Sequence, residues 1–345
     1  MDRLLAKINE VAGRISSAEA GRRKLAEALR KNHPEFFSAV GRQQLDGLRI
    51  AGVDGGIVQR SVHGFDFVLA RAAGVCFSYE KGKIAKVEYH PGKMPSPQFF
   101  ALEALADNEW TQSASMIRQK LEIANAIECV SRFKPSLLLL DGSIVPHYTE
   151  RPTKGSKAKA SYDEMLALYK KLFSGCVASD VMLAGVIEDS RGTKFCKMAK
   201  ERIASPEFAR DLECSRDTSL LYWLLQEGER TLAFRYSEKA EEHPAIKELQ
   251  EAGAEVSSFY LKTAQFDRPV RIDFLGSEAL ADKIASLVLA ISSHHSGYGF
   301  PSVLIEADQA AKLSEEDIEG VCDQVIAHTG PLPGMERLRR DSRPF

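Results

Sequence analysis

Residues 48–56 read LRIAGVDGG, and residues 137–143 read LLLLDGS. In both segments an apolar, strand-like run leads into an aspartate, Asp54 or Asp141, that is followed by glycine. An aspartate at the end of a buried strand is costly to keep ionised unless it has partners. A divalent metal shared by the two carboxylates would supply the missing positive charge. The alternative is that both Asp-Gly pairs form tight turns, since Asp-Gly is a common hairpin signal.

The composition excludes several classes of protein. The 345 residues allow one large domain or two smaller ones, and 44% apolar with 27% charged residues is typical of a globular protein. With 46 basic and 48 acidic residues the net charge is −2, so any nucleic-acid surface would have to be local. The six cysteines form no CxxC pair and are expected to be buried free thiols. The charged N-terminus is no signal peptide and no run is long enough to span a membrane, so a cytoplasmic location without membrane contact is expected.

The hydrophobic pattern predicts an α/β fold. Apolar residues at helical spacing predict a helical arm over residues 1–46, which packs on the body or on a second subunit. The elements then expected are strands at 48–54, 68–77 and 83–89, a helix at 112–133 and a strand at 136–141. This β-β-β-α-β order opens the ribonuclease-H-like fold, a mixed sheet flanked by helices. Asp54 would lie on its central first strand and Asp141 on the fourth strand beside it.

The second half continues the α/β pattern. The expected helices are 162–175, 217–227, 278–292 and 303–312, and the expected strands are 181–188, 231–236, 255–261 and 270–275. A basic segment at 150–159 is either a solvated loop or a contact to a phosphate backbone, through Arg151, Lys154 and Lys157.

A nuclease with two metal ions needs three or four converging ligands. Asp54 and Asp141 are two candidates, and Glu122, mid-helix beside apolar residues, is the preferred third. Arg118, one turn earlier, can pair with Glu122 or with a phosphate. The alternatives are that Glu128 is the ligand or that Glu122 is an exposed helix residue.

The segment at 297–308, GYGFPSVLIEAD, supplies a candidate fourth ligand. A glycine-rich turn leads into a helix on which Asp308 can face the sheet, and Glu306 cannot face inward as well. Tyr298 is a candidate to stack on or hydrogen-bond with a substrate, and a core tyrosine is the alternative. There is no GxxxxGK[ST] loop, no GxGxxG after a strand and no GxSxG elbow. The adjacent His294 and His295 are expected at the surface.

The strand ending at Asp54, then Glu122, then the strand ending at Asp141 together resemble the NurA nuclease family. Four later parts add to the resemblance, which covers roughly residues 45–315: 185–191, 228–231, 259–262 with 270–273, and 297–308. It divides the chain into an arm at 1–46, a ribonuclease-H-fold nuclease domain at 47–315 and a C-terminal helix and tail at 316–345.

The resemblance implies a manganese-dependent nuclease of DNA end processing, with Mn²⁺ or Mg²⁺ as cofactor and two ions expected. Members of the family degrade DNA from the 5′ end, cut single strands, form ring-like dimers and act with the hexameric HerA helicase-translocase. By motif, Asp54, Glu122 and Asp141 would be metal ligands and Tyr298 an active-site residue.

Two positions depart from the family pattern. Asp308 stands where the family usually has His, and Glu188 where it often has Lys. The phosphate-facing role of that lysine would pass to Arg191 or Lys194, or be lost. These departures favour a second hypothesis, a weakly active or inactive nuclease-like subunit that regulates a DNA translocase. A third is an RNA-directed or Holliday-junction nuclease on the same fold.

Overall fold

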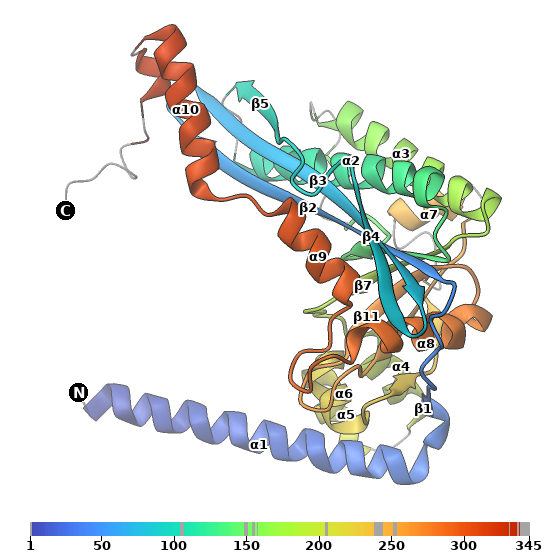
Figure 1. Ribbon diagram of the computed structural model, residues 1–345. Coiled ribbons are helices and arrows are strands. Elements are labelled where there is room, and N and C mark those ends of the chain that lie inside the picture. Colours follow the sequence, from blue (N-terminus) through green and yellow to red (C-terminus); the bar gives the residue numbers. More distant parts are fainter. Residues whose placement is uncertain are drawn as a thin grey trace.

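A single mixed sheet forms the centre of the molecule, with helices on both faces (Figure 1). The computed structural model describes residues 2–103, 107–147, 151–153, 156, 158–203, 206–237, 244–250, 254–330, 332–336 and 338. Eleven strands of this described part join the sheet, and most of them follow the order β1-β8-β10-β11-β7-β6-β2-β3-β4. Strand β5 pairs with β3, and β9 pairs with β10.

The first half of the sheet has the topology predicted from the sequence. Strands β2, β3 and β4 form an antiparallel meander, after which helix α2 leads to β6, which lies parallel to β2. Strand β7 continues the parallel pairing beside β6. These elements span β2 Arg49–Ser61, β3 Phe65–Glu80, β4 Lys83–His90, β5 Gln98–Glu103, α2 Asp107–Phe133, β6 Leu137–Asp141 and β7 Met182–Ile187. The ribonuclease-H-like mixed sheet is therefore confirmed.

The second half extends the sheet with antiparallel strands. Strand β11 pairs with β7, β10 with β11, and the short β8, β9 and β1 complete this side. Their bounds are β1 Phe37–Ala39, β8 Glu229–Thr231, β9 Phe234–Arg235, β10 Val256–Leu261 and β11 Val270–Leu275. The predicted single strand at 231–236 is thus two short strands.

The helices cover the two faces of the sheet in separate layers. Helices α2, α3 (Lys159–Ala178) and α7 (Pro244–Gln250) pack on one face, and α8 (Ala281–Ser292) and α9 (Ser302–Ala311) on the other. Helices α4 (Lys194–Arg202), α5 (Pro206–Cys214) and α6 (Asp217–Leu224) form a third core with the second half of α1 (Asp2–Asn32). Helix α10 (Glu315–Thr329) packs on the far ends of β2 and β3. Short 3-10 helices lie at Pro34–Phe36, Glu278–Leu280 and Pro333–Met335.

Three expectations are corrected. The helix predicted over 1–46 ends at Asn32, because Pro34 cannot continue it, and the chain then adds β1 to the sheet. Strand β2 continues through Asp54-Gly55-Gly56 to Ser61, so the Asp-Gly pair is not a turn and Asp54 is not at a strand end. Cys214 is exposed, whereas the other five cysteines are buried as expected. Across the described helices, none has the length and apolar character needed to cross a bilayer.

Glycines in β2 let helix α9 lie directly on the sheet. A Cβ at Gly52 would lie 3.0 Å from the carbonyl oxygen of Val303, and one at Gly56 would lie 1.9 Å from that of Ala311. The residues at both positions face the α9 layer, so the helix rests on bare backbone. This contact fixes the height of α9, and of Asp308 on it, above the strand.

We predict that Gly56→Ala lowers the free energy of unfolding by about 1–3 kcal/mol, because the new methyl group forces α9 away from β2. Urea unfolding followed by circular dichroism measures this. The matched control is Gly13→Ala in α1, where nothing lies within 4 Å of the new Cβ. It should leave stability unchanged or raise it, since alanine is the better helix former. Equal effects of the two variants would contradict the packing argument.

Candidate active site

Three acidic residues lie at neighbouring positions on adjacent parallel strands. Val53 pairs with Leu140, so Asp54 lies beside Asp141. Asp141 in turn pairs with Val186, and Glu188 follows two residues later, just after β7 ends. Side chains at every second strand position share a face, so all three carboxylates belong to the face that α8 and α9 cover. Strand β6 ends at Asp141 while β2 continues, which leaves the edge of β2 open at this point.

Glu122 reaches the same point from the other face of the sheet. It lies on α2 above Gly55, where a Cβ would come within 2.5 Å of its Oε1 atom. Its exposed fraction is 8%, so it is not the exposed helix residue of the alternative interpretation, whereas Glu128 is exposed. Gly55 is therefore the residue that admits the Glu122 side chain to the strand.

Asp308 approaches from α9. Its negative charge raises the pKa of both Asp54 and Asp141, which places it within electrostatic reach of the pair. Glu306 turns away and accepts a hydrogen bond from the hydroxyl of Tyr89 on β4 at 2.6 Å. Asp308 itself is exposed, whereas Glu306 is half-buried. That Asp308 is the residue of the two that binds a metal stays a prediction.

Burial and mutual repulsion raise the pKa values of the two strand aspartates. Burial is the largest cause of the raised pKa of Asp141, which reaches about 7, and the charges of Asp54, Glu188 and Asp308 add to it. Burial also raises the pKa of Asp54, while the N–H of Gly55, which donates to its Oδ1 at 2.7 Å, acts in the opposite direction. Such a cluster of carboxylate oxygens favours a hard divalent cation.

Arg118 supplies positive charge within the cluster. Its Nη1 atom donates to Oε1 of Glu122 at 2.5 Å. Its charge also lowers the pKa of Asp54 and of Asp141. In the described part of the chain, no three His, Cys, Asp or Glu side chains stand in a ready-made metal-binding arrangement. Glu122 is engaged by the guanidinium, so it would have to reorient to join Asp54 and Asp141 on an ion.

Tyr298 lies at the border of the cluster, on the turn that precedes α9. Burial raises its pKa to about 12, and so does a hydrogen bond to the carboxylate of Glu188. With this pKa the hydroxyl is neutral at physiological pH, and the residue as a whole is 40% exposed. The turn is held by the Gly299 N–H, which donates to Asp267 at 2.7 Å, and by the Thr263 hydroxyl, which donates to the carbonyl of Gly299.

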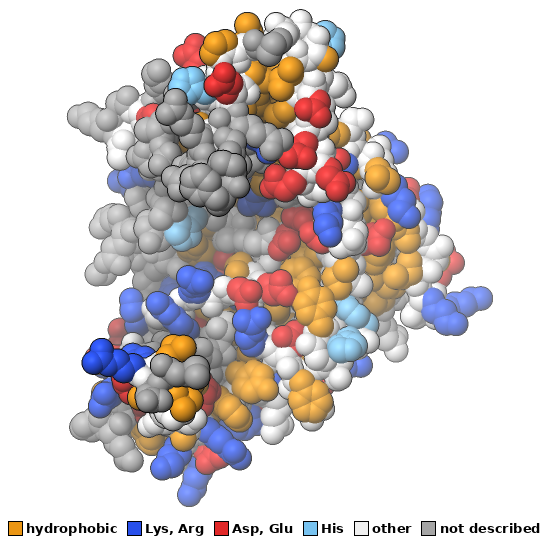
Figure 2. Space-filling view, turned by 90° about the vertical axis from the view of Figure 1, so that its left-hand side faces the viewer, with side chains coloured by type: hydrophobic (Ala, Val, Ile, Leu, Met, Phe, Trp, Pro, Cys, Tyr) orange, Lys and Arg blue, Asp and Glu red, His pale blue; other side chains and the backbone are white. Residues whose placement is uncertain are grey.

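The predicted DNA-contacting residues are not all brought together. Arg118 lies in the cluster, whereas the Lys194 ammonium donates to the carbonyl oxygens of Arg235 and Tyr236. Arg191 is exposed, and the exposed Arg151 lies 3.8 Å from the carboxylate of the half-buried Glu248. Lys154 and Lys157 lie outside the described residues. On the face in Figure 2, acidic side chains gather in the upper and central parts, while Lys and Arg lie in the lower part and along the right-hand side.

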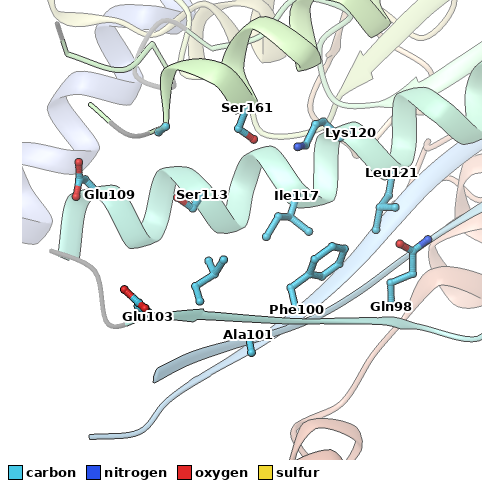
Figure 3. A pocket seen from close by; sticks show the side chains of 12 residues that line it. Gln98, Phe100, Ala101, Glu103, Glu109, Ser113, Ile117, Lys120, Leu121 and Ser161 are labelled. Atoms are coloured by element: carbon cyan, nitrogen blue, oxygen red, sulfur yellow. The ribbon is translucent and has the colours of Figure 1, made fainter. Parts of the chain in front are cut away.

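A separate pocket lies beside the site without including it. Its volume is about 670 Å³, and it lies between α2 and β5, with Phe100, Ile117 and Leu121 among its apolar walls (Figure 3). None of the clustered carboxylates lines it. The pocket is therefore distinct from the group of carboxylates.

Sequence reasoning missed two features of the site. The sequence singled out Glu188 only as the position where a basic residue is absent, whereas in the fold its charge acts on Asp141. The available signal was a third apolar run that ends in acidic residues, at 185–189. The second is Asp273, fully buried on β11, which accepts from the Ser143 hydroxyl at 2.7 Å and from Arg271 at 2.8 Å. It anchors the loop that follows Asp141.

A family model, the NurA domain, matches residues 48–313. The chain belongs to the NurA family. The crystal structure of the NurA nuclease from Sulfolobus solfataricus has a TM-score of 0.62 and 16% sequence identity, and covers 100% of this chain and 98% of that one. A structure of NurA bound to dAMP and manganese has a TM-score of 0.60 and 11% identity, covering 97% and 99%. No curated protein matches the sequence significantly.

These comparisons confirm the family and fold inferred from the motifs. The matched segment begins at the first residue of the LRIAGVDGG run and ends two residues after α9. It therefore includes all five acidic residues of the cluster. The assignment of individual residues as ligands stays a prediction.

We predict that Asp141→Asn stabilises the metal-free protein increasingly as the pH rises from about 4 to about 7. The folded pKa of Asp141 is raised above its ordinary value of 3.8, so the folded state holds the proton more tightly than the unfolded state. Ionising Asp141 therefore costs stability over this window, and the amide escapes that cost. Urea unfolding in EDTA at several pH values measures the difference, which should level off above pH 7. A difference that is constant with pH would contradict the shift.

Proposed function

We propose that this protein is a metal-dependent DNA nuclease that hydrolyses phosphodiester bonds at the carboxylate cluster. The observation that carries the proposal is that Asp54 and Asp141 lie side by side on β2 and β6, with the charges of Glu188 and Asp308 acting on Asp141. Glu122 lies over Gly55, the residue after Asp54, and shares the Arg118 guanidinium with them. A site built from carboxylates suits Mn²⁺ or Mg²⁺. Membership of the NurA family and the manganese in a solved NurA structure support the same conclusion.

Each residue has a role that follows from its position. Asp54, Glu122, Asp141 and Asp308 are the proposed ligands of two ions, which would activate water and stabilise the leaving oxygen. The single proton of the Tyr298 hydroxyl is engaged by the Glu188 carboxylate, so this hydroxyl could donate a hydrogen bond to a substrate phosphate only after leaving Glu188. Its bond to Glu188 fixes the direction in which the hydroxyl points.

The finer assignments rest on the family. We propose single- and double-stranded DNA as substrates, with 5′–3′ exonuclease and single-strand endonuclease activity in DNA end resection during recombinational repair. A hexameric ATPase of the HerA type is the proposed partner. The competing hypothesis is a weakly active subunit that regulates such a translocase, and the acidic Glu188 and Asp308 favour it.

A cleavage assay tests the proposal. End-labelled single-stranded and duplex DNA are incubated with wild type, Asp54→Asn and Asp308→Asn in Mn²⁺, Mg²⁺ or EDTA. We expect cleavage only with metal, and at least a hundredfold loss in Asp54→Asn, because a ligand of the ion is worth several kcal/mol. A loss of similar size in Asp308→Asn would support it as a ligand.

The control for this assay is Glu128→Gln, which changes an exposed carboxylate on the same helix as Glu122. It should cleave as wild type does. Absence of cleavage in every metal would contradict the nuclease proposal. The regulatory subunit would then be favoured if the protein still bound a HerA-type ATPase in a pull-down.

We also propose that the protein forms a homodimer, and the exposed half of α1 supports this. Leu4, Ile8, Val11 and Ile15 follow each other at intervals of four, three and four residues, so they form one stripe, and each is at least 40% exposed. This spacing is the a/d pattern by which two helices pack together. In Figure 1 this half of α1 extends away from the body as an arm, whereas Leu25 and Leu29 in its other half are buried.

We predict that Ile8→Glu combined with Ile15→Glu shifts the protein from dimer to monomer, because each change puts a charge into the apolar stripe. Light scattering coupled to gel filtration measures the mass. The control is Lys24→Glu, a charge change at an exposed position of the same helix, which should leave the mass unchanged. A wild-type protein that is monomeric, or a double variant that stays dimeric, would contradict the role of α1.

A further inference from the structure

The guanidinium of Arg118 lies where a bound cation would be attracted. It donates to Glu122, and its charge acts on Asp54 and Asp141 as well. In return the charges of Glu122, Asp54 and Asp141 raise the pKa of Arg118, with Glu122 as the largest cause. One arginine side chain thus interacts with all three acidic residues that the NurA motifs single out as ligands.

We propose that Arg118 is an internal counterion that competes with the divalent metal for Glu122 and passes to the substrate phosphate once the metal is bound. The inference rests on the proposed nuclease function and adds a regulatory step to the same site. A guanidinium and a metal ion repel each other when both bind the same carboxylate, here Glu122. Binding of the ion and release of the guanidinium are therefore coupled.

The geometry of α2 makes such an exchange possible. Arg118 and Glu122 are four residues apart on one helix, so their contact depends on side-chain rotamers and not on the fold. The Arg118 side chain is 33% exposed, whereas that of Glu122 is 11% exposed. The arginine can therefore swing outward toward solvent or a phosphate, while the glutamate stays at the strand.

The charge balance explains why a counterion is needed. Asp54 and Glu122 are buried, and an ionised carboxylate out of water is costly unless a positive charge accompanies it. Arg118 stabilises the cluster before an ion arrives. A guanidinium also matches a phosphate through paired hydrogen bonds, which gives the released side chain a new partner. Metal binding thus prepares the site for the DNA backbone.

The decisive measurement is Mn²⁺ affinity without DNA, by isothermal titration calorimetry, in wild type, Arg118→Gln and Arg118→Lys. We expect Arg118→Gln to bind Mn²⁺ on the order of tenfold more tightly, because a competing unit charge is gone. Arg118→Lys keeps the charge and should remain close to wild type. Although it binds the ion more tightly, Arg118→Gln should cleave DNA more slowly, because the phosphate has lost its partner. Unchanged or weaker Mn²⁺ binding by Arg118→Gln overturns the proposal.

Two further variants separate failure of this inference from failure of the proposed function. If Glu122→Gln and Asp54→Asn leave Mn²⁺ binding unchanged, the proposed metal site is itself wrong. If both weaken it and Arg118→Gln does not tighten it, the metal site stands and the counterion is wrong.

A second measurement covers the case in which Arg118→Gln does not fold. The Arg118 Nε resonance of the wild type, assigned by its loss in Arg118→Lys, is followed by NMR during addition of diamagnetic Mg²⁺. Release of the guanidinium predicts that the resonance moves with the metal-binding curve. A resonance that stays in place while Mg²⁺ binds overturns the proposal.

Discussion

Electrostatic repulsion opposes the close approach of carboxylates, and the architecture around β2 is arranged to overcome it. Asp54 and Asp141 approach from one face of the sheet and Glu122 from the other. This needs a place where the strand leaves room for side chains. Strand β6 ends at Asp141, so the edge of β2 is open beside Asp54. Gly55 admits Glu122 from the α2 face, and Gly56 admits the end of α9. The cost of the assembled charge appears in the raised pKa of Asp141.

Residues outside the cluster hold its parts in place. The Arg71 guanidinium on β3 donates to the carbonyl oxygens of Ala311 and Lys312 at the end of α9 and to that of Pro95. Helix ends leave such carbonyls without intrahelical partners, so a cation there stabilises the helix end. Asp308 lies one turn earlier on that helix. Its position above the sheet therefore depends on backbone contacts and not on packing of its own side chain.

The sequence predicted the parts of this fold whose signals are local. Four leucines before Asp141 predicted a buried strand, and helical spacing around Glu122 predicted the helix that crosses the sheet. The predicted ends of strands were wrong where pairing with a distant part of the chain determines them. Strand β2 continues past Asp54 because Ile57 and Val58 pair with the long strand β3, which is not visible in residues 48–56. Strand β5 and the short helices α4, α5 and α7 were missed because their stability comes from tertiary packing and not from pattern.

The same limit explains Glu188. The sequence showed only that Glu188 stands where a basic residue was expected from the resemblance. That it lies next to Asp141 could not be predicted without the register of β6 and β7. In the fold it adds negative charge next to Asp141 and holds the hydroxyl of Tyr298. Asp308 adds a further negative charge that acts on both Asp54 and Asp141. Glu188 and Asp308 make the site more anionic, so the ionised forms of the two strand aspartates depend more strongly on nearby cations. Burial favours the protonated form of the aspartates, which is why the pKa of Asp141 is raised. The positive charge of Arg118 acts in the opposite direction and stabilises their ionised form.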